Sequence, residues 1–247
     1  MTVALETVGL HRRFGGLTAT ANVSLRLERG ARHALIGPNG AGKTTLINLL
    51  SGVLRPTAGK ILLDGDDITR LRPDQRARRG LVRTFQINQL FPDLTPLMTI
   101  GLAVSCRLGL DTQLWRRIGS RAAVIDESVA VLERFSLLEV MNRPTAELPY
   151  GQQRLLEIAA AIACGPRVLL LDEPAAGVPE AERNDILAAV AALPPEVTVL
   201  LIEHDMDVVF RFADRISVLV NGALLVEGAP ADIAANERVR EVYLGHG

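Results

Sequence analysis

Short apolar runs are the most regular pattern along this chain of 247 residues. Several of them are almost uninterrupted, which is typical of strands that are buried on both faces of a parallel sheet. These runs are residues 34–36, 168–171, 197–202 and 216–220. Stretches with helical periodicity separate them, so the pattern predicts an α/β fold with a mainly parallel sheet.

A helix is expected directly after the first of these strands. From Thr44 onward the apolar positions follow the spacing of one helix face, with Gly52 available to end the helix. The positions are Leu46, Leu49, Leu50 and Val53. A second stripe, Leu155, Ile158, Ala159 and Ile162, predicts another helix before the strand at residues 168–171.

Two further segments differ from this alternation. Residues 6–65 carry turn signals such as Asp64-Gly65, and they predict an antiparallel β flap that leans on the core. Residues 87–154 lack strand-like runs and contain a helical stripe that begins near Val124, so they predict an α-helical insertion. The expected division is a core with its β flap at residues 1–86 and 155–247, and a helical subdomain at 87–154.

Composition narrows the possible environments and partners. Apolar residues make up 48% and charged residues 22% of the chain, which is ordinary for a globular protein. The net charge of -1 removes the general electrostatic argument for nucleic-acid binding, and the basic residues from Arg76 to Arg83 are expected to form a solvated helix face.

Cysteine usage and apolar segments point to the cytosol. Cys106 and Cys164 have neither the spacing of a disulfide framework nor that of metal ligands. The chain opens without the features of a secretory signal. Residues 97–110 are shorter than the roughly 20 apolar residues that span a bilayer. Any membrane role is therefore expected to depend on a partner.

One glycine-rich motif predicts a phosphate-binding loop. It consists of Gly37, Pro38, Asn39, Gly40, Ala41, Gly42, Lys43 and Thr44, followed by Thr45, and it lies between a predicted strand and a predicted helix. The glycines allow backbone N–H groups to surround phosphate oxygens, and the helix N-terminus adds its positive dipole end. Lys43 would neutralise phosphate charge, and the Thr44 hydroxyl would bind Mg²⁺. The motif therefore predicts ATP and Mg²⁺ as ligands.

A second motif places two carboxylates at the end of a buried strand. Asp172 and Glu173 follow the apolar run at residues 168–171, and the carboxyl ends of strands are where open α/β sheets bind ligands. Asp172 is expected in the metal shell, whereas Glu173 could polarise an attacking water. An acidic surface turn would show the same local pattern, but the phosphate-binding loop favours the catalytic interpretation.

Taken together, the motifs resemble those of ABC ATPases, whose fold is a RecA-like P-loop NTPase. The resemblance covers nearly the whole chain and rests on five segments in the family's order: residues 37–44, 84–86, 148–153, 171–174 and 202–205. The chain looks most like the subgroup that takes up branched-chain amino acids, judged by residues 83–86, 150–153, 172–177, 203–206 and 242–245.

The resemblance implies roles for further residues. Gln86 would reach the metal and the attacking water, and His204 would hydrogen-bond the γ-phosphate. Phe14 would stack on adenine, although simple core packing is the alternative for this ring. Gly151 and Gln152 match the signature loop, which donates to the nucleotide bound by the opposite subunit.

Two prolines depart from the family pattern. Pro149 replaces the signature serine and removes a hydroxyl and a backbone N–H from that loop. Pro179 stands where the family commonly has an aspartate that links the two nucleotide sites. Pro149 predicts a weaker site where this signature loop acts, and Pro179 predicts weaker coupling between the two nucleotide sites.

The resemblance also implies a function and partners. The expected function is the ATPase subunit of a transporter that imports branched-chain or other hydrophobic amino acids. Transport of urea, amides or lipid, or a soluble non-transport role, stay open as alternatives. The expected partners are a second ABC ATPase subunit, identical or not, an integral membrane permease and, indirectly, a substrate-binding protein, with no nucleic acid. The chain would sit on the cytoplasmic face of the membrane.

Overall fold

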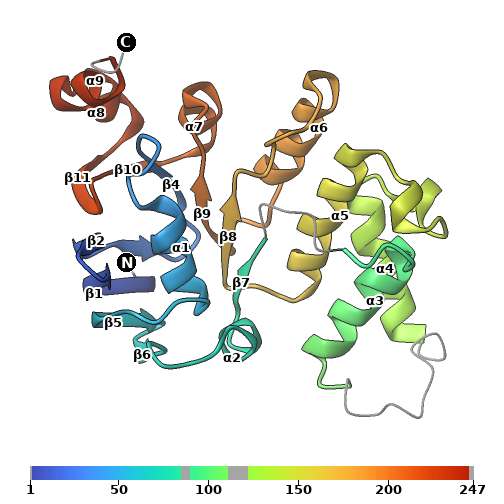
Figure 1. The fold of residues 1–247 in the computed structure, drawn as a ribbon. Coiled ribbons are helices and arrows are strands. Elements are labelled where there is room, and N and C mark those ends of the chain that lie inside the picture. The colour runs from blue at the N-terminus through green and yellow to red at the C-terminus, as the bar shows by residue number, and fades with distance from the viewer. Residues whose placement is uncertain (1, 85–89, 111–121, 245–247) are drawn as a thin grey trace. The chain divides into compact units, whose positions relative to one another are not determined.

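The computed structural model describes residues 2–84, 90–110 and 122–244 (Figure 1). The chain divides into two compact units. The first comprises Met1–Arg83, Arg167–Glu173 and Pro194–Gly247, and the second comprises Thr84–Pro166 and Pro174–Leu193. The sequence led us to assign residues 155–247 to the core. This assignment of residues to domains stays a prediction.

A six-stranded sheet forms the centre of the first unit, and its strand order is β11-β10-β4-β9-β8-β7. The strands are β11 (Ala223–Gly228), β10 (Arg215–Val220), β4 (Arg32–Ile36), β9 (Thr198–Ile202), β8 (Val168–Asp172) and β7 (Leu81–Arg83). Only the pairing of β10 with β11 is antiparallel among the described strands of this sheet. The mainly parallel sheet predicted from the sequence is confirmed, and β4, β9 and β8 end at the same edge.

An antiparallel sheet forms the rest of the β structure in this unit. Its long strand β1 (Val3–Phe14) pairs with β2 (Leu17–Val23), β3 (Arg26–Glu28) and β5 (Ala58–Leu63), and β5 pairs with β6 (Asp66–Asp67). The predicted flap is therefore present. Its predicted span of residues 6–65 was wrong, because strand β4 and the helix after it lie within that span and belong to the core.

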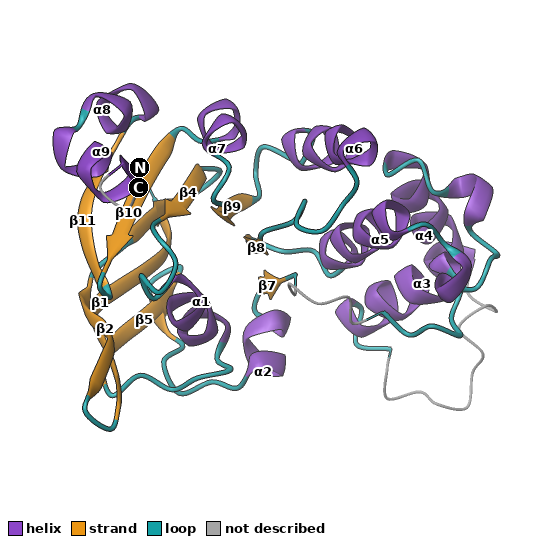
Figure 2. Ribbon diagram, turned by 45° about the horizontal axis from the view of Figure 1, so that its top comes forward, coloured by secondary structure: helices purple, strands orange, loops and turns teal. Residues whose placement is uncertain are grey.

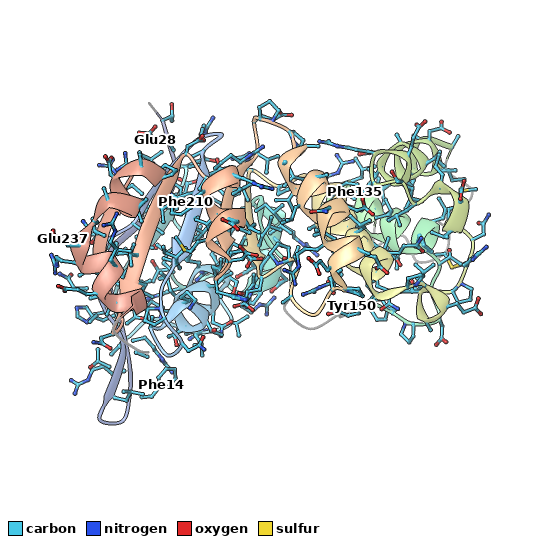
Figure 3. The ribbon with its side chains drawn as sticks, turned by 90° about the horizontal axis from the view of Figure 1, so that it is seen from above. Phe14, Glu28, Phe135, Tyr150, Phe210 and Glu237 are labelled. Atoms are coloured by element: carbon cyan, nitrogen blue, oxygen red, sulfur yellow. The ribbon has the colours of Figure 1, made fainter. Side chains whose placement is uncertain are left out.

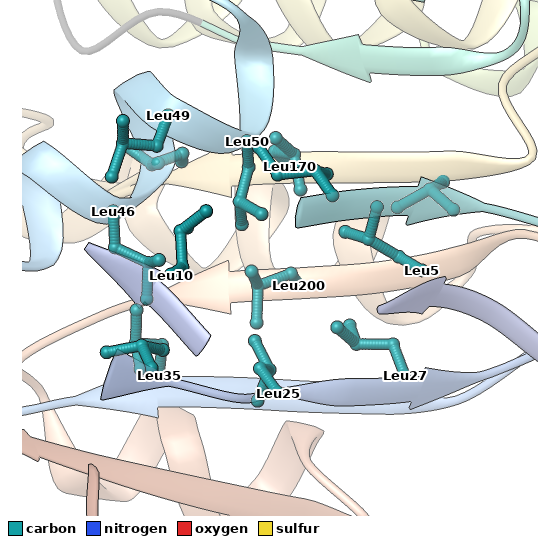
Figure 4. Packing of buried hydrophobic residues seen from close by; sticks show 14 of the residues in the cluster. Leu5, Leu10, Leu25, Leu27, Leu35, Leu46, Leu49, Leu50, Leu170 and Leu200 are labelled. Atoms are coloured by element: carbon teal, nitrogen blue, oxygen red, sulfur yellow. The ribbon is translucent and has the colours of Figure 1, made fainter. Parts of the chain in front are cut away.

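Helix α1 (Lys43–Ser51) carries the glycine-rich loop at its start and packs its leucines into a large core cluster (Figure 4). This cluster joins α1 to side chains from both sheets, among them Leu5, Leu10, Leu35, Leu170 and Leu200. The helix ends at Gly52, whose φ of 84° suits a residue without a Cβ. Val53 lies beyond this end and is 51% exposed, so its predicted place on the apolar face of this helix was wrong.

Arg76 lies buried in helix α2 (Pro73–Arg78) and closes the C-terminal end of α1. Its guanidinium donates to the carbonyl oxygens of Leu49 and Leu50 at 2.7 and 2.6 Å, and also to those of Thr69 and Leu71. The last carbonyls of a helix lack intrahelical partners, and a cation there is favourable. Burial lowers the pKa of Arg76 to about 10. The expectation of a solvated basic face is therefore wrong at this residue.

The other face of the parallel sheet is covered by three helices near the C-terminus. They are α7 (Met206–Phe212), α8 (Pro230–Ala235) and α9 (Glu237–Leu244). Side chains from α7, α8 and α9 pack with Ala34, Ile36, Ile216 and Val218 of the sheet. Because Leu35 belongs to the α1 side and its two neighbours to this side, strand β4 is buried on both faces, as its continuous apolar sequence predicted.

The second unit is helical in its described part. Its helices are α3 (Pro96–Arg107), α4 (Ala122–Arg134), α5 (Tyr150–Ala163) and α6 (Glu180–Ala191), with short 3-10 turns at Leu138–Val140 and Thr145–Glu147. Helix α5 contacts α3, α4 and α6. Across the described residues, no helix combines the length and apolar character needed to cross a membrane.

Replacement of Arg76 by Ala tests its role at the end of α1. We expect Arg76→Ala to lower the free energy of unfolding by about 3 kcal/mol or more, because several buried carbonyls lose a charged donor. The exposed Arg79, three residues on, supplies the control variant Arg79→Ala, for which a change within about 0.5 kcal/mol is expected. Equal effects of the two substitutions in urea unfolding would contradict this role.

Candidate active site

The glycine-rich loop joins the end of β4 to the start of α1 and lies tightly against neighbouring backbone. A Cβ on Gly37 would stand 2.2 Å from the carbonyl oxygen of Leu219, and one on Gly42 would stand 2.5 Å from that of Ala19. The φ of Gly42 is also 101°, which L side chains rarely adopt. Glycine is therefore required at both positions, as the phosphate-loop motif implies.

Lys43 folds back across this loop. Its ammonium donates to the carbonyl oxygens of Gly37 at 2.6 Å and Pro38 at 3.1 Å. Burial lowers the pKa of Lys43, while Glu173 and Asp172 act in the opposite direction. The structure thus brings the loop lysine within electrostatic reach of both strand-end carboxylates. Such a cation beside the N-terminus of α1 suits a bound polyphosphate.

Other loop residues face solvent to different degrees. Asn39, Gly40 and Thr44 are exposed, whereas Ala41 is buried and Thr45 is half-buried. The carbonyl oxygen of Ala41 accepts the backbone N–H of Gly222 at 2.8 Å, which ties the loop to the turn after β10. The loop therefore keeps its shape through backbone contacts, while Thr44 at the first turn of α1 stays accessible to a ligand.

Asp172 and Glu173 lie at the carboxyl end of β8, in different environments. Asp172 is 4% exposed, and its Oδ2 accepts from the Arg83 guanidinium at 2.8 Å. Glu173 has a φ of 47°, although it is not a glycine. A residue held in this left-handed region costs of order 1–3 kcal/mol, and such strain is concentrated at functional sites. The turn directs the two adjacent carboxylates to different surroundings, as expected from the sequence.

His204 follows β9, the strand that pairs with both β4 and β8 (Figure 2). Its Nδ1 lies 3.6 Å from Oε1 of Glu173, and its side chain is 67% exposed. Because β9 stands between the strands that carry the loop and Glu173, the topology alone brings His204 to the same edge. The structure therefore brings Glu173 close to His204 and within electrostatic reach of Lys43.

Glu203, beside His204, is a buried acid to which the sequence analysis gave no role. It is 3% exposed, and one carboxylate oxygen accepts the backbone N–H of His204 at 3.2 Å. Burial raises the pKa of Glu203, and the His204 N–H bond partly offsets this effect. The signal that could have found it is an acid directly after a continuous apolar run, the same pattern that identified Asp172.

Phe14 ends strand β1 at the β1–β2 hairpin (Figure 3). Its ring is 42% exposed, and the guanidinium of Arg12 lies 4.4 Å from the ring centroid. The exposure argues against simple core packing and leaves ring surface accessible to a planar ligand. Gln86, the remaining residue predicted to act at the reaction centre, lies outside the described residues.

Gly151 and Gln152 belong to the second unit, at the start of α5. The helix begins after Pro149, whose side chain supplies no cap. Instead, Oε2 of Glu182 in α6 accepts the backbone N–H of Gly151 at 2.9 Å. The Glu182 carboxylate therefore accepts a hydrogen bond from a backbone N–H group at the N-terminal, positive end of this helix. Pro179 occupies the corresponding N-cap position of α6, again without a side-chain cap.

Comparisons with known proteins show which sequences and folds this chain is similar to. The sequence model of the ABC transporter family matches residues 20–176, and that of the branched-chain amino acid ATP-binding cassette transporters matches residues 223–247. The chain is 44% identical to the high-affinity branched-chain amino acid transport ATP-binding protein BraF of Pseudomonas aeruginosa, over 98% of this chain and 97% of that protein. It is 43% identical to LivG of Escherichia coli, with the same coverage.

Solved structures include similar folds. The crystal structure of the ADP conformation of an ATP-binding cassette from an ABC transporter matches with a TM-score of 0.85 and 30% identity, covering 99% of this chain and all of that one. A nucleotide-free cassette from an ABC transporter matches with a TM-score of 0.84 and 31% identity, covering 98% of each chain.

The buried Glu203 generates a pH-dependent prediction. The pKa of Glu203 in the folded protein lies above its usual value of 4.5, so the folded state holds this proton more tightly than the unfolded state. Wild-type stability is therefore lost as pH rises from 4.5 through the folded pKa. We expect Glu203→Gln to gain stability relative to wild type across this window and to keep a constant gain above it.

Urea unfolding at a series of pH values measures this difference. The exposed Glu241 in α9 supplies the control variant Glu241→Gln, which should change the free energy of unfolding by no more than about 0.5 kcal/mol. A Glu203→Gln gain that does not change with pH would contradict the assignment.

Proposed function

This chain belongs to the ABC transporter family of ATP-binding cassettes, and we propose that it hydrolyses ATP to drive import of branched-chain or other hydrophobic amino acids. The observation that carries the proposal is the convergence of Lys43, Glu173 and His204 at one edge of the parallel sheet. The similarity to branched-chain amino acid transport ATP-binding proteins extends over 98% of the chain and supports the amino-acid cargo.

The nucleotide would bind along the first unit. Backbone N–H groups of residues 37–45 and the N-terminus of α1 would hold the phosphates, with Lys43 exchanging its carbonyl partners for phosphate oxygens. A charged acceptor makes a stronger hydrogen bond with an ammonium than a carbonyl does, so the exchange is favourable. The exposed face of Phe14 would stack on the adenine.

Thr44 and Asp172 would hold Mg²⁺, together with Gln86. The described residues contain no group of three or more His, Cys, Asp or Glu side chains that could hold a metal without a ligand. This donor set fits Mg²⁺, which is usually bound through one or two carboxylates, water and substrate phosphates. When bound, the ion would neutralise charge on the β- and γ-phosphates.

Glu173 and His204 would act on the terminal phosphate. Glu173 would accept a proton from the attacking water, because its strained turn directs it away from Asp172 and toward His204. His204 would donate to the γ-phosphate from the neighbouring strand end. Phosphoryl transfer depends mainly on such positioning and charge stabilisation.

Hydrolysis would involve a second cassette and a membrane partner. Gly151 and Gln152 at the start of α5 would donate to the nucleotide held by a second ABC subunit, once Glu182 releases the Gly151 N–H. Closure of two cassettes would pull on an integral membrane permease, which receives cargo from a substrate-binding protein. The chain would thus work as a peripheral protein on the inner face of the cell membrane.

The variant Glu173→Gln tests the proposed base. We expect its steady-state phosphate release to fall by about 10²-fold or more, because a general base contributes roughly that factor. ATP binding should persist, since Gln keeps the size of the side chain. A matched control is Glu180→Gln, at an exposed position in the first turn of α6, which should turn over like wild type. Equal phosphate release by wild type and Glu173→Gln would contradict the proposal.

A further inference from the structure

Arg83 places a buried positive charge at the end of strand β7. Its side chain is 9% exposed, and the side chain of its partner Asp172 is 5% exposed. Removal of a guanidinium from water costs several kcal/mol unless the charge is paired and hydrogen-bonded. We expected Arg83 to belong to a solvated basic face, and its burial shows that this expectation is wrong. The structure instead places it beside the carboxylate proposed to hold the metal.

The guanidinium of Arg83 reaches two elements at once. One nitrogen donates to Oδ2 of Asp172 at 2.8 Å, and the other donates to Oδ1 of Asn48 at 2.5 Å and to Oγ of Ser51 at 3.4 Å. Asp172 lies on β8, whereas Asn48 and Ser51 lie on α1. Arg83 is therefore a bridge between the strand that ends in the acidic pair and the helix that follows the phosphate loop.

The face of α1 that Arg83 contacts is the face that carries Thr44. Thr44, Asn48 and Ser51 are spaced i, i+4 and i+7, and residues at this spacing lie one above another along a helix. The planar guanidinium has donors in a fixed geometry, so its simultaneous bonds to Asp172 and Asn48 set the separation of the two elements. Because Thr44 lies on the same face of α1 one turn before Asn48, this bridge also bears on how Asp172 lies relative to Thr44.

Arg76 provides a contrast within the same unit. It is also buried, but it donates to backbone carbonyl oxygens at the end of α1 and in the loop that precedes α2. These contacts serve helix termination. Arg83 donates to side chains of the two elements that carry Thr44 and Asp172, so its contacts bear on their placement.

We propose that Arg83 is a positioning residue that fixes Asp172 relative to Thr44, and so sets how strongly Mg²⁺ strengthens the binding of ATP. The inference rests on the proposed function, because it takes Thr44 and Asp172 as the residues that hold the metal. Residues that orient metal-binding side chains typically change metal affinity by about 10–100-fold when replaced. The phosphate loop itself does not touch Arg83 through these bonds, so ATP affinity without metal should be insensitive to the bridge.

The test measures the dissociation constant of ATP by calorimetry in Mg²⁺ and again in EDTA, for the full-length chain. The quantity of interest is the ratio of the two constants, which reports the gain from metal. In Asn48→Ala the Arg83–Asp172 ion pair is kept, and the bridge to α1 is reduced to the 3.4 Å contact with Oγ of Ser51. In Arg83→Lys the charge stays, but a single ammonium cannot reproduce the two-sided geometry.

We expect both variants to lose about tenfold of the gain from Mg²⁺, with ATP affinity in EDTA within about twofold of wild type. The ion pair between the exposed Arg167 and the half-buried Asp64 supplies the control variant Arg167→Lys, which should keep the wild-type ratio. Thermal unfolding of each variant, recorded in EDTA, separates loss of the fold from loss of the metal effect.

Other results overturn the inference in distinguishable ways. If Asn48→Ala and Arg83→Lys keep the full gain from Mg²⁺, or weaken ATP binding equally with and without the metal, Arg83 does not position the metal site. If wild type itself gains nothing from Mg²⁺ or fails to bind ATP, the proposed function fails first.

Discussion

The rest of the site depends on one interaction, in which the Lys43 side chain hydrogen-bonds to the backbone of its own loop. Its ammonium is held by the carbonyl oxygens of Gly37 and Pro38, in a partly buried position that lowers the pKa of Lys43. The loop can take this shape because Gly37 and Gly42 allow its backbone to lie against Leu219 and Ala19. The phosphate-binding loop is therefore packed in place by the parallel sheet and the β1–β2 hairpin.

Strand order determines what faces this lysine. The strands lie in the order β4-β9-β8-β7. At one edge of the sheet they therefore carry, in the same order, the glycine-rich loop, His204, the acidic pair and Arg83. Charges concentrated in this way need compensation in a partly buried site, since unpaired buried charges are costly. Arg83 compensates Asp172, while the fields of Asp172 and Glu173 act on Lys43. Electrostatics and geometry thus constrain the same few residues.

Local sequence patterns predicted the parts of the site that depend on local structure. The strand–loop–helix context of residues 37–44 and the apolar run before Asp172 were sufficient for the parallel sheet and for helix α1. The roles of Arg76 and Arg83 could not be predicted in this way, because they depend on distant partners: Leu50 lies 26 residues from Arg76, and Asp172 lies 89 residues from Arg83. Val53 failed for a local reason, since Gly52 ended the helix one residue earlier.

In the signature region, too, the sequence could not predict interactions with residues that are distant along the chain. Pro149 could be recognised as a departure from the family pattern, but its structural consequence depends on Glu182, which caps α5 from another helix. Glu203 likewise gains its raised pKa from burial, which no short motif reports. Residues whose environment comes from distant segments therefore required the structure.

The most direct test of the central claim is the affinity of ATP for Lys43→Ala, measured by calorimetry in the presence of Mg²⁺. If Lys43 neutralises the terminal phosphates from the cradle described above, the dissociation constant should rise by at least about tenfold, or about 1.4 kcal/mol. An unchanged dissociation constant in a folded Lys43→Ala protein would contradict the account.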